Sequence, residues 1–137
     1  MRFLLDSNVI SEMQRRSPSP KVLSWLARNE SASAISDVLI GELVKGAWNI
    51  SDAQKRDITL EWIREIEELF NDERLLPLDL PTLKTWGKIS GINLQNGRRL
   101  APLDSLIGAI AIQNDLTLVT RNVSDFPTDV RTFNPWD

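Results

Sequence analysis

The stretch Phe3-Leu4-Leu5-Asp6-Ser7-Asn8-Val9-Ile10-Ser11-Glu12 decides the fold, because a short apolar strand runs directly into a polar segment. Phe3–Leu5 has the composition of a buried strand, and Asp6 ends it. A small helix is expected to follow, with apolar residues up to Met13. A buried strand followed at once by a helix is the start of a βαβ unit, so this stretch predicts an α/β protein with a parallel sheet.

The rest of the chain repeats this alternation of short apolar runs and longer helical patterns. Further strands are expected at Ser33–Ile35, Leu75–Leu78, Leu116–Thr120 and Val130–Phe133. Helices are expected to begin at Ser19-Pro20, at Ser36, near Asp52, near Pro81 and at Pro102. The length of 137 residues is that of one compact domain, so we predict a single domain over residues 1–137.

The helical patterns carry apolar stripes that we interpret as core. In the helix expected over residues 52–70, Ile58, Trp62, Ile66 and Phe70 repeat every four residues, and Leu69 widens the stripe. The helix expected from Pro102 has an apolar face made of Leu103, Leu106, Ile107, Ile110 and Ala111.

The composition excludes several kinds of chemistry. The chain has no Cys, no His and no Tyr, so it has no thiolate nucleophile, no zinc–thiolate site and no Ser–His–Asp triad. Acid–base chemistry is left to Asp, Glu or Lys, and a metal site would use oxygen ligands, which suit Mg²⁺ or Mn²⁺. The net charge of −3 is unusual for a nucleic-acid-binding protein, unless cations bound by carboxylates reverse the local field.

No apolar run approaches the roughly 18 residues of a membrane span, and no signal peptide is recognisable. A cytoplasmic protein without membrane association is therefore expected.

Four acids are candidates for one site, because ligands of open parallel sheets bind outside the carboxyl ends of the strands. Asp6 ends the first strand, Asp104 lies in the first turn of its helix, and Asp125 lies in the loop after Thr120. Glu42 stands among apolar neighbours and needs a partner. Each Asp could instead be a turn former or a helix cap.

Four short blocks of sequence resemble the PIN-domain family, in order and over the whole chain. The opening strand with Asp6-Ser7-Asn8 is similar to the start of PIN-domain proteins. Glu42-Leu43-Val44-Lys45-Gly46-Ala47, Pro102-Leu103-Asp104 and Thr120-Arg121-Asn122 with Asp125-Phe126 resemble the later acidic blocks. The ending Asn134-Pro135-Trp136 resembles the FitB-like branch.

The resemblance implies a three-layer α/β/α fold with a parallel sheet of about five strands. It also implies Mg²⁺- or Mn²⁺-dependent RNA cleavage by the toxin of a type II toxin–antitoxin pair. In that case Asp6 and Asp104 would hold the principal metal, Glu42 would complete its shell or orient the attacking water, and Asp125 would support a second metal. Relatives are typically homodimers, silenced in larger complexes by a cognate antitoxin.

Polar and basic residues near these acids are candidates for contact with RNA. Ser7, Asn8 and Thr120 could bind the carboxylates or the scissile phosphate, and Arg121 could bind the RNA backbone. Arg98-Arg99 could also steer the RNA backbone. All three arginines could instead pair with an acidic or C-terminal segment of an inhibitor, or be solvated. Many PIN proteins have Asp where this chain has Asn122, so either Asn122 or Asp125 could complete the site. Trp25, Trp48 and Trp62 could line an antitoxin groove, but we interpret them as core.

Three other functions are compatible with parts of the pattern. A PIN nuclease of RNA processing would have the same fold and chemistry. A receiver-like signalling module would use Asp79 as its phosphoacceptor, but the first strand ends in a single acid and Arg121, not Lys, follows the late strand. We interpret Asp79 as a cap or turn residue. A protein with a decayed site would serve only as a binding partner, but the four family acids or near equivalents are present.

Overall fold

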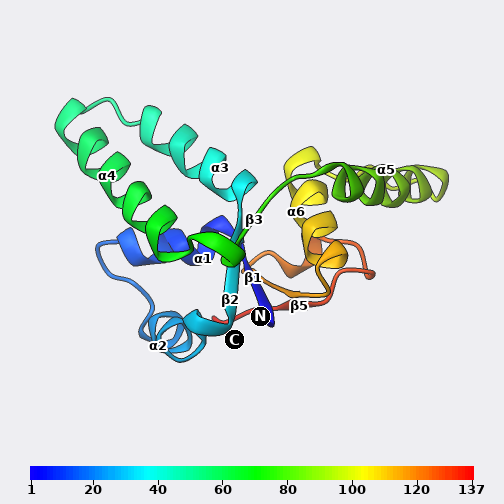
Figure 1. The fold of residues 1–137 in the computed structure, drawn as a ribbon, viewed down its shortest axis with the longest axis horizontal. Coiled ribbons are helices and arrows are strands. Elements are labelled where there is room, and N and C mark those ends of the chain that lie inside the picture. The colour runs from blue at the N-terminus through cyan, green and yellow to red at the C-terminus, as the bar shows by residue number, and fades with distance from the viewer.

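A parallel sheet forms the centre of the molecule (Figure 1). The computed structural model describes residues 1–71 and 73–137, and within them five strands are hydrogen-bonded in the order β3-β2-β1-β4-β5, all parallel. Their bounds are β1 Phe3–Leu5, β2 Ser33–Ser36, β3 Leu75–Leu76, β4 Thr117–Val119 and β5 Thr132–Phe133. The expected parallel sheet of about five strands is confirmed.

Helices connect these strands in the alternating order that the sequence predicts. They are α1 Ser7–Ser11, α2 Pro20–Asn29, α3 Asp37–Trp48, α4 Ala53–Leu69, α5 Leu80–Gln95 and α6 Pro102–Gln113. Short 3₁₀ turns lie at Glu12–Gln14, Glu30–Ala32, Asp72–Arg74 and Val123–Asp125. None of the helices in the described residues is both long and apolar enough to cross a membrane.

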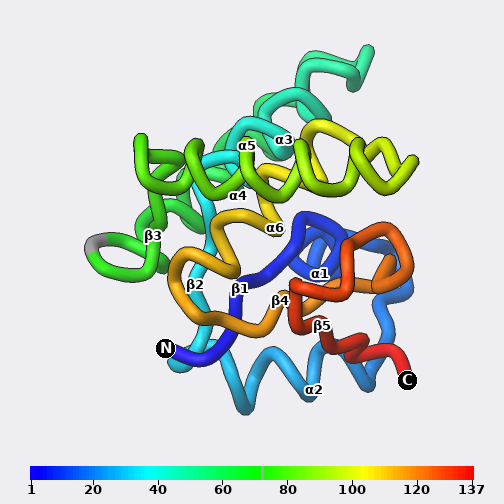
Figure 2. The backbone as a smooth tube through the Cα atoms, turned by 90° about the vertical axis from the view of Figure 1, so that its right-hand side faces the viewer, coloured from blue at the N-terminus to red at the C-terminus, as the bar shows by residue number. Residues whose placement is uncertain are grey.

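The two faces of the sheet build two hydrophobic cores, because neighbouring residues of a strand point to opposite faces. Leu5, Ile35 and Val119 face a core that α1, α2, α3 and α4 complete. Their neighbours Leu4, Ala34 and Leu118 face a second core under α6, and α5 packs on α6. Figures 1 and 2 show the helices divided between the two sides of the sheet. The three-layer α/β/α architecture is therefore confirmed.

Polar side chains begin the helices where the sequence predicts them. Ser19 caps α2 by accepting a hydrogen bond from Val22 N–H, and Pro20 occupies its first turn. Ser36, the last residue of β2, caps α3 by accepting from Leu39 N–H at 3.1 Å. Since the Ser36 cap follows β2 directly, it fixes where α3 starts and therefore where Glu42 lies.

Several apolar residues expected in the core are exposed instead. Trp48 is 63% exposed, Ile58 62%, Leu69 48% and Leu103 42%. Trp48 ends α3 and Ile58 lies early in α4, in the part of this helix pair that reaches beyond the sheet (Figure 1), where no second layer covers it. Trp25 is buried as expected and Trp62 packs partly buried against the first core.

The outer strands are shorter than predicted. The runs Leu75–Leu78 and Val130–Phe133 contribute two ladder residues each. Leu78 N–H is bound by the Asp37 side chain instead of by a neighbouring strand. The apolar composition predicted burial at these positions. How many residues of each run pair with a neighbouring strand was decided by tertiary contacts.

Helix α5 ends at Gln95, and Gly97 forms a left-handed turn directly after it. Gly97 has φ +78°, its N–H donates to Leu94 O at 3.1 Å, and Arg98 N–H donates to Asn93 O at 2.8 Å. These two bonds are the Schellman arrangement, which favours glycine at the left-handed position.

We expect Gly97→Ala to lower the free energy of unfolding by about 1 kcal/mol, because a Cβ strains the left-handed conformation. Gly91→Ala is the matched control on the same helix. A Cβ at Gly91 meets nothing within 4 Å, so Ala there should stabilise the helix by up to about 1 kcal/mol. Denaturant unfolding of both variants checks this, and shifts of the same sign would contradict it.

Candidate active site

The carboxyl ends of β1 and β4 lie side by side, because these two strands are paired in register from Phe3 and Thr117. The chain builds β2 and β3 on one side of β1, and then crosses to build β4 and β5 on the other side. The direction in which successive strands are added to the sheet therefore reverses between β1 and β4, although all strands run parallel. Asp6 follows β1 and Thr120 follows β4, so both lie where ligands of such sheets bind.

Asp6 is held in one orientation by hydrogen bonds from both neighbouring segments. Its Oδ2 accepts the Thr120 hydroxyl at 2.8 Å, and its Oδ1 accepts Ser7 N–H at 2.8 Å. The side chain is 6% exposed and that of Thr120 is fully buried. Burial raises the pKa of Asp6, the bonds from Thr120 and Ser7 lower it, and the negative charge of Asp125 raises it. Asp6 is therefore a fixed, poorly solvated carboxylate that is also repelled by the negative charge of Asp125.

The Asn8 side chain extends this network along the end of β4. Its amide donates to Thr120 Oγ1 at 3.3 Å and weakly to Asp6 Oδ2 at 3.5 Å. Its carbonyl accepts Arg121 N–H at 3.3 Å. Asn122 N–H donates to Thr120 Oγ1 at 3.1 Å. The Thr120 hydroxyl thus gives its single proton to Asp6 and accepts from Asn8 and Asn122.

Glu42 reaches the same crevice from α3. It is half-buried, and within the described residues its Oε1 atom is buried without a hydrogen-bond partner. Burial, together with the nearby negative charges of Asp6 and Asp104, raises the pKa of Glu42 to about 7, although the charge of Lys45 acts in the opposite direction. One oxygen of the carboxylate predicted to need a partner therefore has no hydrogen bond from the described residues. Such an oxygen is suited to a proton or a cation.

Asp104 and Asp125 bring two more charges to the crevice from α6 and the turn after β4. Burial raises the pKa of Asp104, and Asp6 and Asp125 add to this by repulsion. Asp6 and Asp104 therefore each act electrostatically on the other predicted acids, although the four residues are far apart in sequence. As the side chains stand, no group of three acids in the part of the chain that the structure describes is arranged to hold a metal ion.

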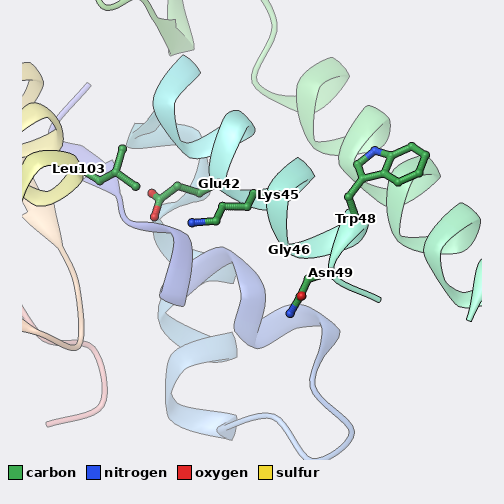
Figure 3. A pocket seen from close by; sticks show the side chains of 6 residues that line it. All are labelled: Glu42, Lys45, Gly46, Trp48, Asn49 and Leu103. Carbon is green, nitrogen blue, oxygen red and sulfur yellow. The ribbon is translucent and has the colours of Figure 1, made fainter. Parts of the chain in front are cut away.

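The predicted basic residues take different positions. The guanidinium of Arg121 lies over the Trp136 ring of the C-terminal segment, 5.1 Å from its centroid, and the residue remains exposed. Arg98 reaches the Ser124 carbonyl at 3.5 Å, in the turn that carries Asp125. Lys45 acts on Glu42 through its charge, and its ammonium group points toward the Glu42 carboxylate (Figure 3).

Asp79 is a helix cap, as the sequence predicted. It accepts hydrogen bonds from the N–H and the hydroxyl of Thr82, at 3.0 and 2.6 Å, at the start of α5. Its carboxylate is thereby engaged in a local structural role. This removes the residue on which the receiver-like interpretation depended.

One buried acid was not recognised from the sequence. Glu12 is 3% exposed, its Oε2 accepts Ser19 N–H at 3.0 Å, and Arg15 lies 3.5 Å from its Oε1. These contacts tie the loop before α2 to the end of the first helical segment. Its partners lie in a loop without periodicity, so no pattern in the sequence indicated its burial.

A cavity opens beside Glu42, between α3 and the start of α6 (Figure 3). Its volume is about 530 Å³, and its lining comprises Glu42, Lys45, Gly46, Trp48, Asn49 and Leu103. A second cavity, of about 430 Å³, lies along α1 and α4 and shares Glu42 and Gly46 with the first. The candidate site is therefore open on both sides of Glu42.

The acidic crevice lies where the strand order of a parallel sheet reverses. This arrangement defines a class of α/β protein with a candidate site made of carboxylates. Comparisons with known proteins make this specific. Residues 3–126 match the PIN domain family. Toxin FitB of Neisseria gonorrhoeae is 35% identical over 137 residues, covering 98% of each chain, and VapC ribonuclease Y4jK of Sinorhizobium fredii is 26% identical with the same coverage.

The crystal structure of FitAcB from Neisseria gonorrhoeae superposes with a TM-score of 0.89, at 34% identity and 98% coverage of both chains. VapBC2 from Rickettsia felis shares the fold, with a TM-score of 0.82 at 20% identity and full coverage of both chains. This chain belongs to the PIN-domain family. The resemblance to PIN-domain proteins of the VapC/FitB kind is confirmed.

Replacing Thr120 by Val should lower the free energy of unfolding by about 1–3 kcal/mol, because Asp6, Asn8 and Asn122 each lose their hydrogen bond to the buried Thr120 hydroxyl. Thr117→Val, at a half-buried position at the start of β4, is the control. Equal unfolding free energies for the two variants would show that the hydroxyl network contributes nothing.

The pKa of Glu42 predicts a pH dependence of stability in metal-free buffer. Because the folded-state pKa of about 7 lies above the ordinary 4.5, the folded protein binds the proton more tightly than the unfolded chain. The free energy of unfolding should therefore fall as pH rises from about 4.5 to about 7. Glu42→Gln should reduce this fall, and Glu65→Gln, on the exposed side of α4, should not. Identical pH profiles for wild type and Glu42→Gln would contradict the assignment.

Proposed function

We propose that this chain is a Mg²⁺- or Mn²⁺-dependent endoribonuclease and acts as the toxin of a type II toxin–antitoxin system. The observation that carries the proposal is the partnerless buried Oε1 of Glu42, within electrostatic reach of Asp6 and Asp104. The names of two relatives, Toxin FitB and VapC ribonuclease Y4jK, support the toxin and ribonuclease parts of it.

The donor set suits a hard divalent cation. The site offers only oxygen ligands, its acids repel one another, and one buried oxygen has no partner. Asp6, Asp104 and Glu42 would hold the ion, with Asp125 in support. Such an ion supplies an activated water and neutralises charge at the leaving oxygen during phosphodiester cleavage.

The surrounding residues orient the acids. The Thr120 hydroxyl and Ser7 N–H hold Asp6 with both oxygens directed by fixed donors. Asn8 braces Thr120 and, through Arg121 N–H, the loop after β4. Ser7 also lines the second cavity, where its hydroxyl could contact the RNA backbone. Arg121, held over Trp136, would bind phosphate at the rim.

The partners follow from the same proposal. We expect a single PIN domain that forms a homodimer and is held in a larger complex by a cognate antitoxin. Two similar solved structures, FitAcB and FitAB bound to a DNA fragment, contain more than a FitB chain alone, which supports this expectation.

Asp6→Asn and Asp104→Asn should each reduce RNA cleavage in the presence of Mg²⁺ by at least about 100-fold, because loss of a residue that merely orients a ligand already costs 10–100-fold. Asp57→Asn, on the exposed side of α4, is the control and should cleave as wild type does. The measurement is the rate of cleavage of a labelled RNA by the purified chain, with and without EDTA.

Full RNA cleavage by both Asp6→Asn and Asp104→Asn would contradict the carboxylate mechanism. Induction in cells tests the toxin part: wild type should arrest growth and produce new RNA 5′ ends, while Asp6→Asn should do neither. Growth arrest without new RNA ends would separate toxicity from RNA cleavage and contradict the proposal.

A further inference from the structure

The first turn of α6 carries Asp104 and begins without a side-chain cap. Each of the helices α1 to α5 is preceded by a side chain that accepts a hydrogen bond from a first-turn N–H; these caps are Asp6, Ser19, Ser36, Asp52 and Asp79. Helix α6 follows Ala101, which offers no such side chain, and Pro102 opens its first turn. The position of this turn, and of Asp104 within it, therefore depends on contacts from elsewhere in the fold.

A chain of two hydrogen bonds reaches this turn from α5. The Trp86 indole N–H donates to Ser105 Oγ at 2.9 Å, and the Ser105 hydroxyl donates to Pro102 O at 2.9 Å. The hydroxyl thus gives its single proton to the backbone and accepts from the indole. Ser105 is 5% exposed, and Trp86 is half-buried on α5, which packs on α6 (Figures 1 and 2). Because water is largely excluded, the two bonds hold the turn more strongly than surface bonds would.

Asp104 lies inside the segment that this chain closes. It stands between Pro102 and Ser105, the two residues that the serine hydroxyl joins, so a rotation of the turn would disturb the bond to Trp86. The negative charges of Asp6 and Asp125 repel the Asp104 carboxylate. In the absence of a cation, this repulsion favours withdrawal of Asp104 from the crevice. The tie to α5 opposes such a withdrawal.

We propose that Trp86 is a positioning residue for Asp104: through Ser105 it holds the first turn of α6, and so keeps the carboxylate at the crevice before a divalent cation binds. This inference rests on the proposed metal-dependent function. It adds to that function α5, a helix that contributes none of the four acids. A carboxylate that is held in place in advance loses less conformational freedom on binding, so the tie should strengthen metal binding.

The test is the affinity of the purified chain for Mn²⁺, measured by electron paramagnetic resonance without RNA, so that it does not depend on cleavage. Trp86→Phe keeps an aromatic ring but loses the indole N–H, and Ser105→Ala removes its acceptor. Each should weaken Mn²⁺ binding about tenfold, as expected for residues that orient a metal ligand. The double variant should bind about as weakly as Ser105→Ala, because both changes break the same chain of bonds. Additive losses would overturn the proposal.

A second hydrogen bond between α5 and α6 provides the matched control. The Thr85 hydroxyl donates to Gln113 Oε1 at 2.6 Å, at the far end of α6 and about two turns from Ser105. Thr85→Val removes this bond from the residue next to Trp86 and should leave the Mn²⁺ affinity unchanged. An equal loss of affinity in Thr85→Val and Trp86→Phe would show a general loosening of α5 on α6, and would overturn the specific role of Trp86.

Hydrogen exchange in metal-free buffer tests whether the turn itself is held. Ser105 N–H donates to Ala101 O at 2.9 Å, and it should exchange about tenfold faster in Trp86→Phe, as expected for the loss of one buried hydrogen bond. Leu118 N–H, in the central strand β4, donates to Arg131 O at 2.8 Å and should exchange at the wild-type rate. An unchanged rate at Ser105, or a parallel rise at Leu118, would contradict a local hold on the turn.

The remaining outcomes separate this inference from the proposed function. Equal Mn²⁺ affinities of wild type and Trp86→Phe would overturn the positioning role and leave the metal-dependent function standing. Failure of wild type to bind Mn²⁺ would overturn both.

Discussion

The hydrogen bond from the Thr120 hydroxyl to the Asp6 carboxylate joins the ends of β1 and β4, the two strands between which the strand order reverses. Everything else in the candidate site is arranged around it. Asp6 is buried and therefore poorly solvated, and the bond fixes one oxygen of a carboxylate that repels its acidic neighbours. Because Thr120 also accepts from Asn8 and Asn122, its position depends on both loops at once. A shift of either loop would move Asp6.

The arrangement concentrates negative charge in a place where the protein offers little to neutralise it. Lys45 is the cation whose charge lowers the pKa of Glu42, while Arg121 lies over Trp136 and Arg98 reaches a backbone carbonyl. A crevice with excess carboxylates binds protons or cations from solution more readily than a neutral one. Bound cations would reverse the local field, so a net charge of −3 does not oppose the proposed action on a polyanion.

The two sides of Glu42 have different chemistry. On one side, α1 and α4 line a cavity with small polar residues such as Ser7, Ser11 and Thr59. On the other side, the end of α3 presents Lys45 and Asn49, while Trp48 points away from Glu42 toward α4 (Figure 3). An extended polymer crossing the crevice would therefore meet different surfaces on the two sides of Glu42.

Local sequence determined the elements and several of their boundaries. Ser19, Ser36 and Asp79 cap the helices that they were predicted to begin, and Gly97 ends α5, because caps and left-handed turns depend on contacts within a few residues. The order of strands and helices was sufficient to predict a parallel sheet. The acids proposed for the site were predicted from their places after strands and from family resemblance, neither of which requires knowing their distances.

Only the tertiary structure decided which side chains are buried and how the acids act on one another. Ile58 follows the same apolar periodicity as the buried Ile66 and Phe70, and Trp48 was interpreted as core. Both are exposed, because the α3–α4 pair reaches beyond the sheet that would cover them. The raised pKa of Glu42 arises from burial and from Asp6 and Asp104, which lie 36 residues before it and 62 after it. Burial and charge act through space, so a pattern along the chain could suggest these residues but could not fix the environment that makes them a site.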